Sequence, residues 1–431
     1  MTNEPHQAVL LSLDRDTAEL SQLTTSLDYT VSKIFIQQRN HPDVNTFLGS
    51  GKIKEIQEFL ENSTEQYLII VNGELKPSQW FNLEKRFDAP VYDRIHLILS
   101  IFEQRAQRKE AKLQVKLAFL QYERPYVREL IHRARAGEHP GLMAGGEYQV
   151  DDYYEMIKKQ MKTIRQELAK IRNNRDLQRK TRYRSGFYLI SLAGYTNAGK
   201  SCLLNLLSGG QVKVEGKLFS TLSTTTRRIP KQFHAHTMPI LLTDTVGFID
   251  NLPSWVIDAF HSTLEEIEVA DVVLLIVDAS DPPELVQKKL HVSLAELKEL
   301  NVTSPIIIVL NKIDVLTNKQ LNTLQTQLQH NADSIDKPMI PISAKHNQHI
   351  DDLFDTIYTV LPQKTKLHIT IPNTPSAHPF VSHLFNHTQV NDVNYGENII
   401  LDVACNSKMK DKIKAQVQDL KGTAIETEKT R

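Results

Sequence analysis

Several features that define other classes of protein are scarce in this sequence of 431 residues. Only two cysteines occur, Cys202 and Cys405, and their wide separation predicts neither a disulfide framework nor a cysteine metal site. No uninterrupted apolar run approaches the roughly 18 residues that a membrane-spanning helix needs. The amino terminus has no basic segment before its first apolar run, so no signal peptide is expected. We therefore expect a cytoplasmic protein with no membrane-spanning segment.

Net charge is also absent, because 51 lysines and arginines balance 51 aspartates and glutamates. The local distribution is uneven. Residues 104–135 contain nine basic and three acidic side chains, and residues 158–184 contain eleven basic and two acidic ones. Segregated basic charge is typical of a nucleic-acid footprint, although a solvated helix face would also carry it.

The pattern of apolar runs predicts an α/β fold in four parts. Residues 1–108 alternate short apolar runs with helical segments, which predicts a small α/β domain with a parallel sheet. Residues 109–184 carry apolar side chains at helical spacing and predict a basic helical hairpin, with "RARAGEHPGLMAGGE" at its tip. Its second arm has a heptad-like seam of Ile157, Met161, Ile164, Leu168 and Ile171.

Residues 185–364 contain continuously apolar strands of the kind buried on both faces of a doubly wound, mostly parallel sheet. "HIDDLFDTIYTVLP" is expected to be the closing helix of this domain, ended by Pro362. Residues 365–431 predict a small α+β domain in the order strand, helix, strand, helix, and residues 421–431 are expected to fray.

The stretch "GYTNAGKS", Gly194 to Ser201, matches the pattern of a phosphate-binding P-loop between an apolar strand and a helix. Its glycines let backbone N–H groups face phosphate oxygens. Lys200 would place a positive charge at the β and γ phosphates, and the Ser201 hydroxyl would bind Mg²⁺. The earlier stretch "LGSGK", Leu48 to Lys52, lacks the required spacing, so we interpret it as a turn into a helix.

Three further motifs follow in the order expected of a guanine-nucleotide site. "DTVG" places Asp244 at a strand end near the metal and Gly247 near the γ-phosphate. "NKID" places Asp314 where its carboxylate can accept from N1–H and the 2-amino group of guanine, a donor pair that adenine lacks. Lys312 is expected to pack along the base and brace the P-loop. "SAK", residues 343–345, can donate a backbone N–H to guanine O6.

A threonine that closes on Mg²⁺ should lie in "LFSTLSTTTRRI", where spacing alone does not choose among Thr221, Thr224, Thr225 and Thr226. His383 and His387 are one helical turn apart, as zinc ligands can be, but no third ligand is in view. "HAH", residues 234–236, is expected on a solvated hairpin between strands.

The motifs in this order resemble the translational GTPases of the Obg–HflX class. "GYTNAGKS", "LFSTLSTTTRR", "DTVGFIDNLP", "FLGSGKIKEI" and "VYDRIHLILSIFEQRAQRKEAKLQVKLAFLQY" resemble the HflX family in particular, over about residues 30–365. The resemblance implies GTP hydrolysis coupled to the 50S ribosomal subunit and its rRNA, including splitting of stalled or idle 70S ribosomes. It also carries the Mg²⁺-binding threonine to Thr221, with Thr225 in reserve. The chain is expected to act as a monomer.

Together the motifs and the resemblance define the expected site. The metal ligands are Ser201, Thr221 and Asp244, and the residues expected to act in catalysis are Lys200, Thr221, Gly247 and Asn197. The residues expected around GTP or GDP are Gly194, Tyr195, Thr196, Asn197, Ala198, Gly199, Lys200, Ser201, Phe219, Ser220, Thr221, Leu222, Ser223, Asp244, Thr245, Val246, Gly247, Asn311, Lys312, Ile313, Asp314, Ser343, Ala344 and Lys345.

The sequence departs from the family at the hairpin tip. Where relatives carry a segment like "GPGETQLETDRR", only Gly145, Gly146 and Glu147 remain as a trace, and Lys158 and Lys159 stand in place of the arginine pair. This change puts the contacts of the tip with the ribosome in doubt. Ser223-Thr224 also replaces an Asp-Pro pair.

The position after Gly247 is Phe248, which cannot orient water, so intrinsic hydrolysis is expected to be slow until a partner orders the site. Asn197 either holds K⁺ beside the phosphates or caps the turn. Two alternatives to splitting or rescue of 70S ribosomes remain open. One is a nucleotide-gated ribosome or RNA clamp with negligible turnover, and the other is a factor for 50S assembly. A kinase-like enzyme that uses ATP conflicts with "NKID".

Overall fold

The computed structural model describes residues 6–135, 146–184, 187–210, 224–230, 240–249, 253, 255–256, 264–329, 336–362 and 364–427. The chain divides into two compact units. The first unit comprises Met1–Ile171, Gly216–Leu222 and Leu252–Phe260. The second comprises Arg172–Glu215, Ser223–Asn251 and His261–Arg431. In the part of the chain described, no helix is both long enough and apolar enough to cross a membrane.

The first unit begins with the predicted α/β domain. Its four-stranded sheet has the order β2-β1-β3-β4, and every pairing is parallel. The Leu48–Lys52 stretch leads into a helix as predicted, because Gly49 is the N-cap of α2. The elements are β1 (His6–Ser12), α1 (Ala18–Ser26), β2 (Tyr29–Ile36), α2 (Ser50–Glu61), β3 (Tyr67–Val71), α3 (Pro77–Phe87), β4 (Val91–Asp93) and α4 (Arg94–Arg105).

The predicted helical hairpin consists of α5 (Lys109–Arg135) and α6 (Gly146–Arg184). The predicted seam is confirmed at Ile157, Met161 and Ile164, which are buried against apolar side chains of α5. Leu168 is half-buried against the same cluster. The basic side chains of Lys158, Lys159, Lys162 and Arg165 on α6 are exposed. Residues 136–145 of the tip lie outside the described residues.

The second unit contains the predicted doubly wound sheet, with strand order β10-β9-β8-β5-β7-β6. All its pairings are parallel except that of β6 with β7. Helices α7 and α11 pack on one face, and α9 packs on β8. The elements are β5 (Tyr188–Gly194), α7 (Lys200–Ser208), β6 (Thr225–Arg228), β7 (Ile240–Asp244), β8 (Val272–Asp278), α9 (Pro283–Glu299), β9 (Ile306–Asn311), a 3₁₀ turn (Ile313–Val315), α10 (Asn318–Gln329), β10 (Met339–Pro341) and α11 (Ile350–Val360).

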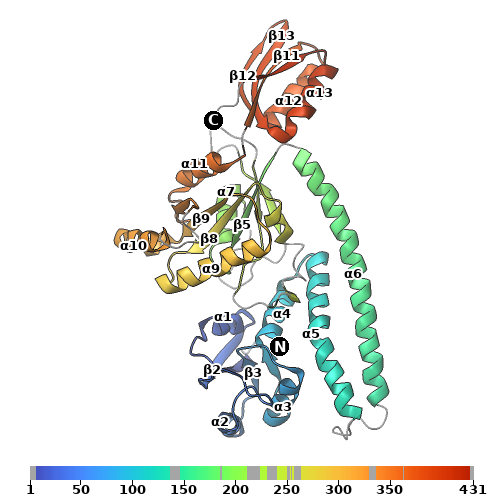
Figure 1. The fold of residues 1–431 in the computed structure, drawn as a ribbon, viewed down its shortest axis with the longest axis vertical. Coiled ribbons are helices and arrows are strands. Elements are labelled where there is room, and N and C mark those ends of the chain that lie inside the picture. The colour runs from blue at the N-terminus through green and yellow to red at the C-terminus, as the bar shows by residue number, and fades with distance from the viewer. Residues whose placement is uncertain are drawn as a thin grey trace. The chain divides into compact units, whose positions relative to one another are not determined.

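The carboxyl-terminal part differs from the prediction. It runs strand, helix, strand, strand, helix, strand, with an antiparallel sheet of order β12-β13-β11-β14 that α12 and α13 cover on one face (Figure 1). The expected strand, helix, strand, helix order is wrong because β12 and β14 are polar, mostly exposed edge strands without apolar alternation. Fraying is likewise wrong for residues 423–427, which form β14. The elements are β11 (Lys364–Pro372), α12 (Ala377–His387), β12 (Gln389–Tyr395), β13 (Asn398–Asn406), a 3₁₀ turn (Ser407–Met409), α13 (Lys410–Asp419) and β14 (Thr423–Thr427).

Candidate nucleotide site

The P-loop connects the carboxyl end of β5 to the first turn of α7. Gly194 has a φ of 137°, and a Cβ there would overlap the carbonyl oxygen of Ile276 on β8. Gly199, the N-cap of α7, has a φ of 98°, and a Cβ there would overlap Nδ2 of Asn311. Both positions therefore require glycine, for backbone conformation and for space. The loop ends at a helix N-terminus, where backbone N–H groups attract anions.

Lys200 is the first residue of α7 and is 7% exposed. Its Nζ donates to the carbonyl oxygens of Gly194 at 3.0 Å and Tyr195 at 2.8 Å. Burial lowers the pKa of Lys200 to about 8, and the charge of Asp244 opposes that shift. The ammonium group is thus held in a poorly solvated place by the loop that would surround a phosphate, whose negative charge would compensate its burial.

Ser201 and Asp244 come together from neighbouring elements. The Ser201 hydroxyl donates to Oδ2 of Asp244 at 2.7 Å, and the Asp244 residue is fully buried. Asp244 reaches this place because β7 pairs with β5 so that Asp244 lies opposite Leu192. A hydroxyl and a carboxylate beside a phosphate loop are the hard oxygen ligands that Mg²⁺ prefers, so these residues fit a magnesium ion.

The "DTVG" turn is hydrogen-bonded to the P-loop. The Thr196 N–H donates to the Phe248 carbonyl at 2.9 Å, and the Phe248 N–H donates to the Gly194 carbonyl at 3.0 Å. A Cβ on Gly247 would stand 2.8 Å from Nζ of Lys200, so this glycine lies directly beside the lysine. The Phe248 side chain is 6% exposed. Its apolar ring is packed in the protein and offers no hydrogen bond to water.

Asn311, the first residue of "NKID", connects the P-loop to the "SAK" stretch. Its Nδ2 donates to the carbonyl oxygen of Ala198 at 2.9 Å, and its Oδ1 accepts from the N–H of Ala344 at 3.0 Å. Asn311 thus makes a side-chain contact with the P-loop of the kind expected of Lys312, and the packing of Lys312 along the base stays a prediction. Nζ of Lys312 instead lies 2.5 Å from Oδ2 of Asp278.

Asp314 lies on the 3₁₀ turn after β9 and is held by the "SAK" loop. The Ser343 hydroxyl donates to Oδ1 of Asp314 at 2.6 Å, and Nε2 of His346 lies 3.6 Å from Oδ2. The hydrogen bond from Ser343 is the main cause of a lowered pKa of Asp314, with smaller contributions from His346 and Lys345. The carboxyl therefore stays ionised at neutral pH, as an acceptor for two N–H groups must.

Asp278 was not singled out from the sequence. It ends β8 at the carboxyl edge of the sheet, and its Oδ1 accepts from the N–H and hydroxyl of Ser280 while Oδ2 contacts Lys312. The signal was available, because ligands of doubly wound sheets bind at the carboxyl ends of the strands.

Of the remaining predicted residues, some lie in the described parts of the chain and others lie outside them. Asn197 is exposed and has a φ of 63°, a left-handed conformation that asparagine tolerates. Thr225 and Thr226 lie in β6, where Thr225 is opposite Asp244 and the Thr226 hydroxyl is 2.9 Å from that of Thr243. Phe219, Ser220, Thr221, Leu222 and Ser223 lie outside the described residues, as does the "HAH" stretch.

The two histidines of α12 stack on each other, with ring centroids 4.2 Å apart. Burial and the neighbouring His387 and Lys412 lower the pKa of His383. Among the residues that the structure describes, no cluster of three His, Cys, Asp or Glu side chains could hold a metal ion.

Comparison with known proteins agrees with this geometry. Family models match three consecutive stretches: "GTP-binding GTPase N-terminal" over residues 14–103, "GTP-binding GTPase Middle Region" over 105–182, and "50S ribosome-binding GTPase" over 189–312. GTPase HflX of Thermococcus kodakarensis is 41% identical over 407 residues, which cover 92% of this chain and 90% of that protein. The chain belongs to the HflX family of GTPases.

Other HflX proteins match at similar length. GTPase HflX of Methanocaldococcus jannaschii is 39% identical over 373 residues, covering 86% of this chain and 88% of that protein. Among solved structures, the crystal structure of the SsGBP and GDP complex aligns with a TM-score of 0.50 at 27% identity. The alignment covers 83% of this HflX-family chain and 98% of SsGBP.

Proposed function

We propose that this chain binds GTP or GDP at Gly194–Ser201 with Mg²⁺, and that it hydrolyses GTP in the cytoplasm, as a monomer, when it associates with the 50S ribosomal subunit. The contact between Ser201 and Asp244 beside the buried Lys200 carries the proposal, because a cation and two oxygen ligands then converge on one glycine loop. Membership of the HflX family supports the choice of GTP.

Each residue has a distinct part in binding. The loop amides and Lys200 hold the β and γ phosphates, while Ser201, Asp244 and Thr221 hold the metal. Mg²⁺ would supply neutralising charge on the phosphate oxygens. Gly247, which lies beside Lys200, offers its N–H to the γ-phosphate. Asp314 selects guanine, and Ser343 keeps its carboxylate in place.

Slow intrinsic hydrolysis follows from the place of Phe248. Its ring is buried and its backbone is bonded to the P-loop, so it does not position the attacking water. The missing polar group must then be supplied when a partner orders the segments around the γ-phosphate. The experiment is GTP hydrolysis by the purified chain with and without 50S subunits at matched salt, and we expect a clear stimulation. Equal rates in the two samples would contradict the ribosomal partner.

The exposed basic side chains of α6 support an rRNA partner, because cationic helices neutralise phosphates and release counterions. Association with 50S subunits should therefore weaken steeply as salt increases. Sedimentation of 70S ribosomes with this protein and GTP, GDP or a non-hydrolysable analogue would separate splitting or rescue of 70S particles from 50S assembly.

A second candidate function is a nucleotide-gated ribosome or RNA clamp with negligible turnover, which the buried Phe248 favours. Phosphate release at saturating 50S decides between the two. K⁺ at Asn197 is a separate proposal, supported by the exposed side chain in the P-loop. Replacing K⁺ by Na⁺ should slow hydrolysis, and an unchanged rate would remove K⁺ from the mechanism.

A further inference from the structure

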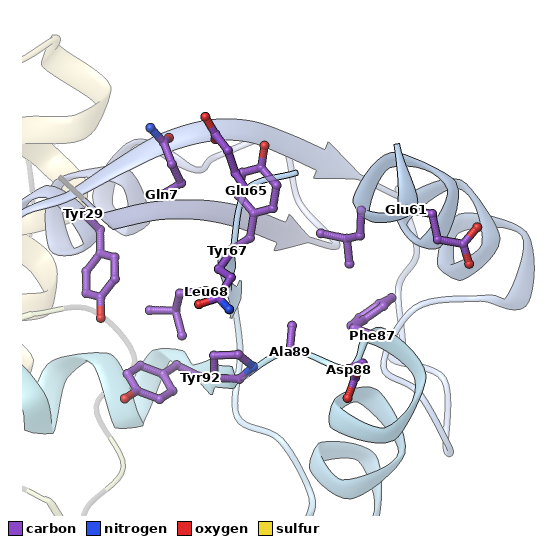
Figure 2. A pocket seen from close by; sticks show the side chains of 13 residues that line it. Gln7, Tyr29, Glu61, Glu65, Tyr67, Leu68, Phe87, Asp88, Ala89 and Tyr92 are labelled. Atoms are coloured by element: carbon purple, nitrogen blue, oxygen red, sulfur yellow. The ribbon is translucent and has the colours of Figure 1, made fainter. Parts of the chain in front are cut away.

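The amino-terminal α/β domain contains a pocket of about 500 Å³ that the nucleotide site does not use (Figure 2). It lies at the amino edge of the parallel sheet, since Gln7, Tyr29, Tyr67 and Tyr92 come from the first residues of β1, β2, β3 and from β4. Ligands of doubly wound sheets usually bind at the opposite, carboxyl edge. The pocket therefore needs an explanation of its own.

The charge around this pocket has one sign. Three carboxylates line it, those of Glu61, Glu65 and Asp88, and no lysine, arginine or histidine does. Two helices also end there: Glu61 is the last residue of α2, and Asp88 is the C-cap of α3. The C-terminus of a helix carries a partial negative charge, which adds to that of the carboxylates. Lys85 and Arg86 lie in the last turn of α3, but neither lines the pocket.

The walls are aromatic and apolar. Leu68, Tyr67 and Phe87 are at most 9% exposed, and Tyr29 and Tyr92 are half-buried. Burial, with Tyr92 close by, raises the pKa of Tyr29, so its ring stays neutral. Aromatic faces attract cations and also pack against methylene groups. Such walls do not suit a hydrated divalent metal ion, because the ion prefers a full shell of oxygen ligands.

Figure 2 shows Tyr29 and Tyr92 at one end of the pocket and Glu61, Phe87 and Asp88 at the other. An elongated ligand with positive charge and an aliphatic body matches both ends. We propose that this pocket binds a linear alkylammonium cation, supplied either as a free polyamine or as a lysine side chain of another protein. This binding is independent of the GTP site.

The test is calorimetric titration of the full chain with spermidine at physiological ionic strength. We expect saturable binding that the double variant Glu61→Gln/Glu65→Gln weakens about three- to tenfold, the range for two partly exposed ion pairs. The matched control is Glu74→Gln/Glu103→Gln, which removes the same charge from exposed positions of the same unit that do not line the pocket. The control should bind spermidine within about twofold of the unchanged protein.

Equal weakening in the two variants would mean general charge attraction and would overturn the proposal, as would the absence of saturable binding by both probes. A tri-lysine peptide is the second probe: binding of the peptide without spermidine binding would assign the cation to a protein partner. Saturating GDP should leave the titration unchanged. That arm separates this pocket from the nucleotide site, so each proposal can fail alone.

Discussion

The hydroxyl of Ser201 donates a 2.7 Å hydrogen bond to Oδ2 of Asp244, which joins the end of the P-loop to the end of strand β7. Both oxygens can turn to one Mg²⁺ ion. We expect Ser201→Ala to reduce the gain in GTP affinity that Mg²⁺ provides by about 1–3 kcal/mol, while affinity in EDTA changes little. Dissociation constants with and without Mg²⁺ measure this. Ser208→Ala, at the other end of α7, is the matched control and should keep the full gain.

Asp314 is expected to set the choice of base. In Asp314→Asn, the acceptor for the guanine N1–H and amino group becomes partly a donor, so GTP binding should weaken by about 1–3 kcal/mol. Xanthosine triphosphate should bind the variant better than it binds the original chain, because its 2-oxo group can accept from the new amide. Competition titrations with both nucleotides measure the change. Asp355→Asn, an exposed change on α11, should alter neither affinity, and unchanged GTP affinity in Asp314→Asn would contradict the assigned role.

The burial of Lys200 predicts a pH dependence of nucleotide binding. Because the pKa of Lys200 is lowered to about 8 in the free protein, the ammonium loses its proton above that pH. Bound phosphates stabilise the charged form, so binding above pH 8 must take up a proton. The affinity for GDP should thus be constant from about pH 7 to 8 and fall as pH rises further. Titrations in buffers of different ionisation enthalpy count the protons, and no uptake at pH 9 would contradict the buried lysine.

The same group acts in the opposite sense on stability. The unfolded chain binds a proton at Lys200 up to the ordinary pKa of 10.5, whereas the folded chain releases it near 8. The folded state therefore binds fewer protons between these values. The contribution of Lys200 to the free energy of unfolding should therefore rise as pH increases from 8 toward 10.5. This contribution should be lowest below pH 8.

What the sequence could predict follows from how each segment is buried. Strands β5, β8 and β9 are mostly apolar because both faces are covered, and so they stand out in the sequence. Strands β6, β12 and β14 lie at sheet edges with polar, partly exposed residues, and they leave no such signal.

The residues of the nucleotide site likewise divide into those that the sequence predicts and those that it does not. Gly194, Lys200 and Asp244 follow from local motifs whose spacing the backbone imposes. The contacts of Asn311 with Ala198 and of Asp278 with Lys312 join segments far apart in the chain, and only the register of the sheet brings them together.

Trp255 provides a reporter on the segment that follows Gly247. Its ring stacks on Tyr122 with centroids 6.5 Å apart, and Tyr122 also contacts Trp80 at 5.4 Å. These are the two tryptophans of the chain. Only eight peptide bonds separate Gly247 from Trp255, so this indole lies close in sequence to the glycine that is expected to contact the γ-phosphate.

We therefore expect the emission of Trp255 to differ between GDP and a non-hydrolysable GTP analogue. The variant Trp80→Phe leaves Trp255 as the single indole and isolates its signal. Trp255→Phe, which keeps Trp80 in contact with Tyr122, is the control and should respond much less. Identical spectra for both nucleotides in Trp80→Phe would contradict a coupling between the "DTVG" turn and Trp255.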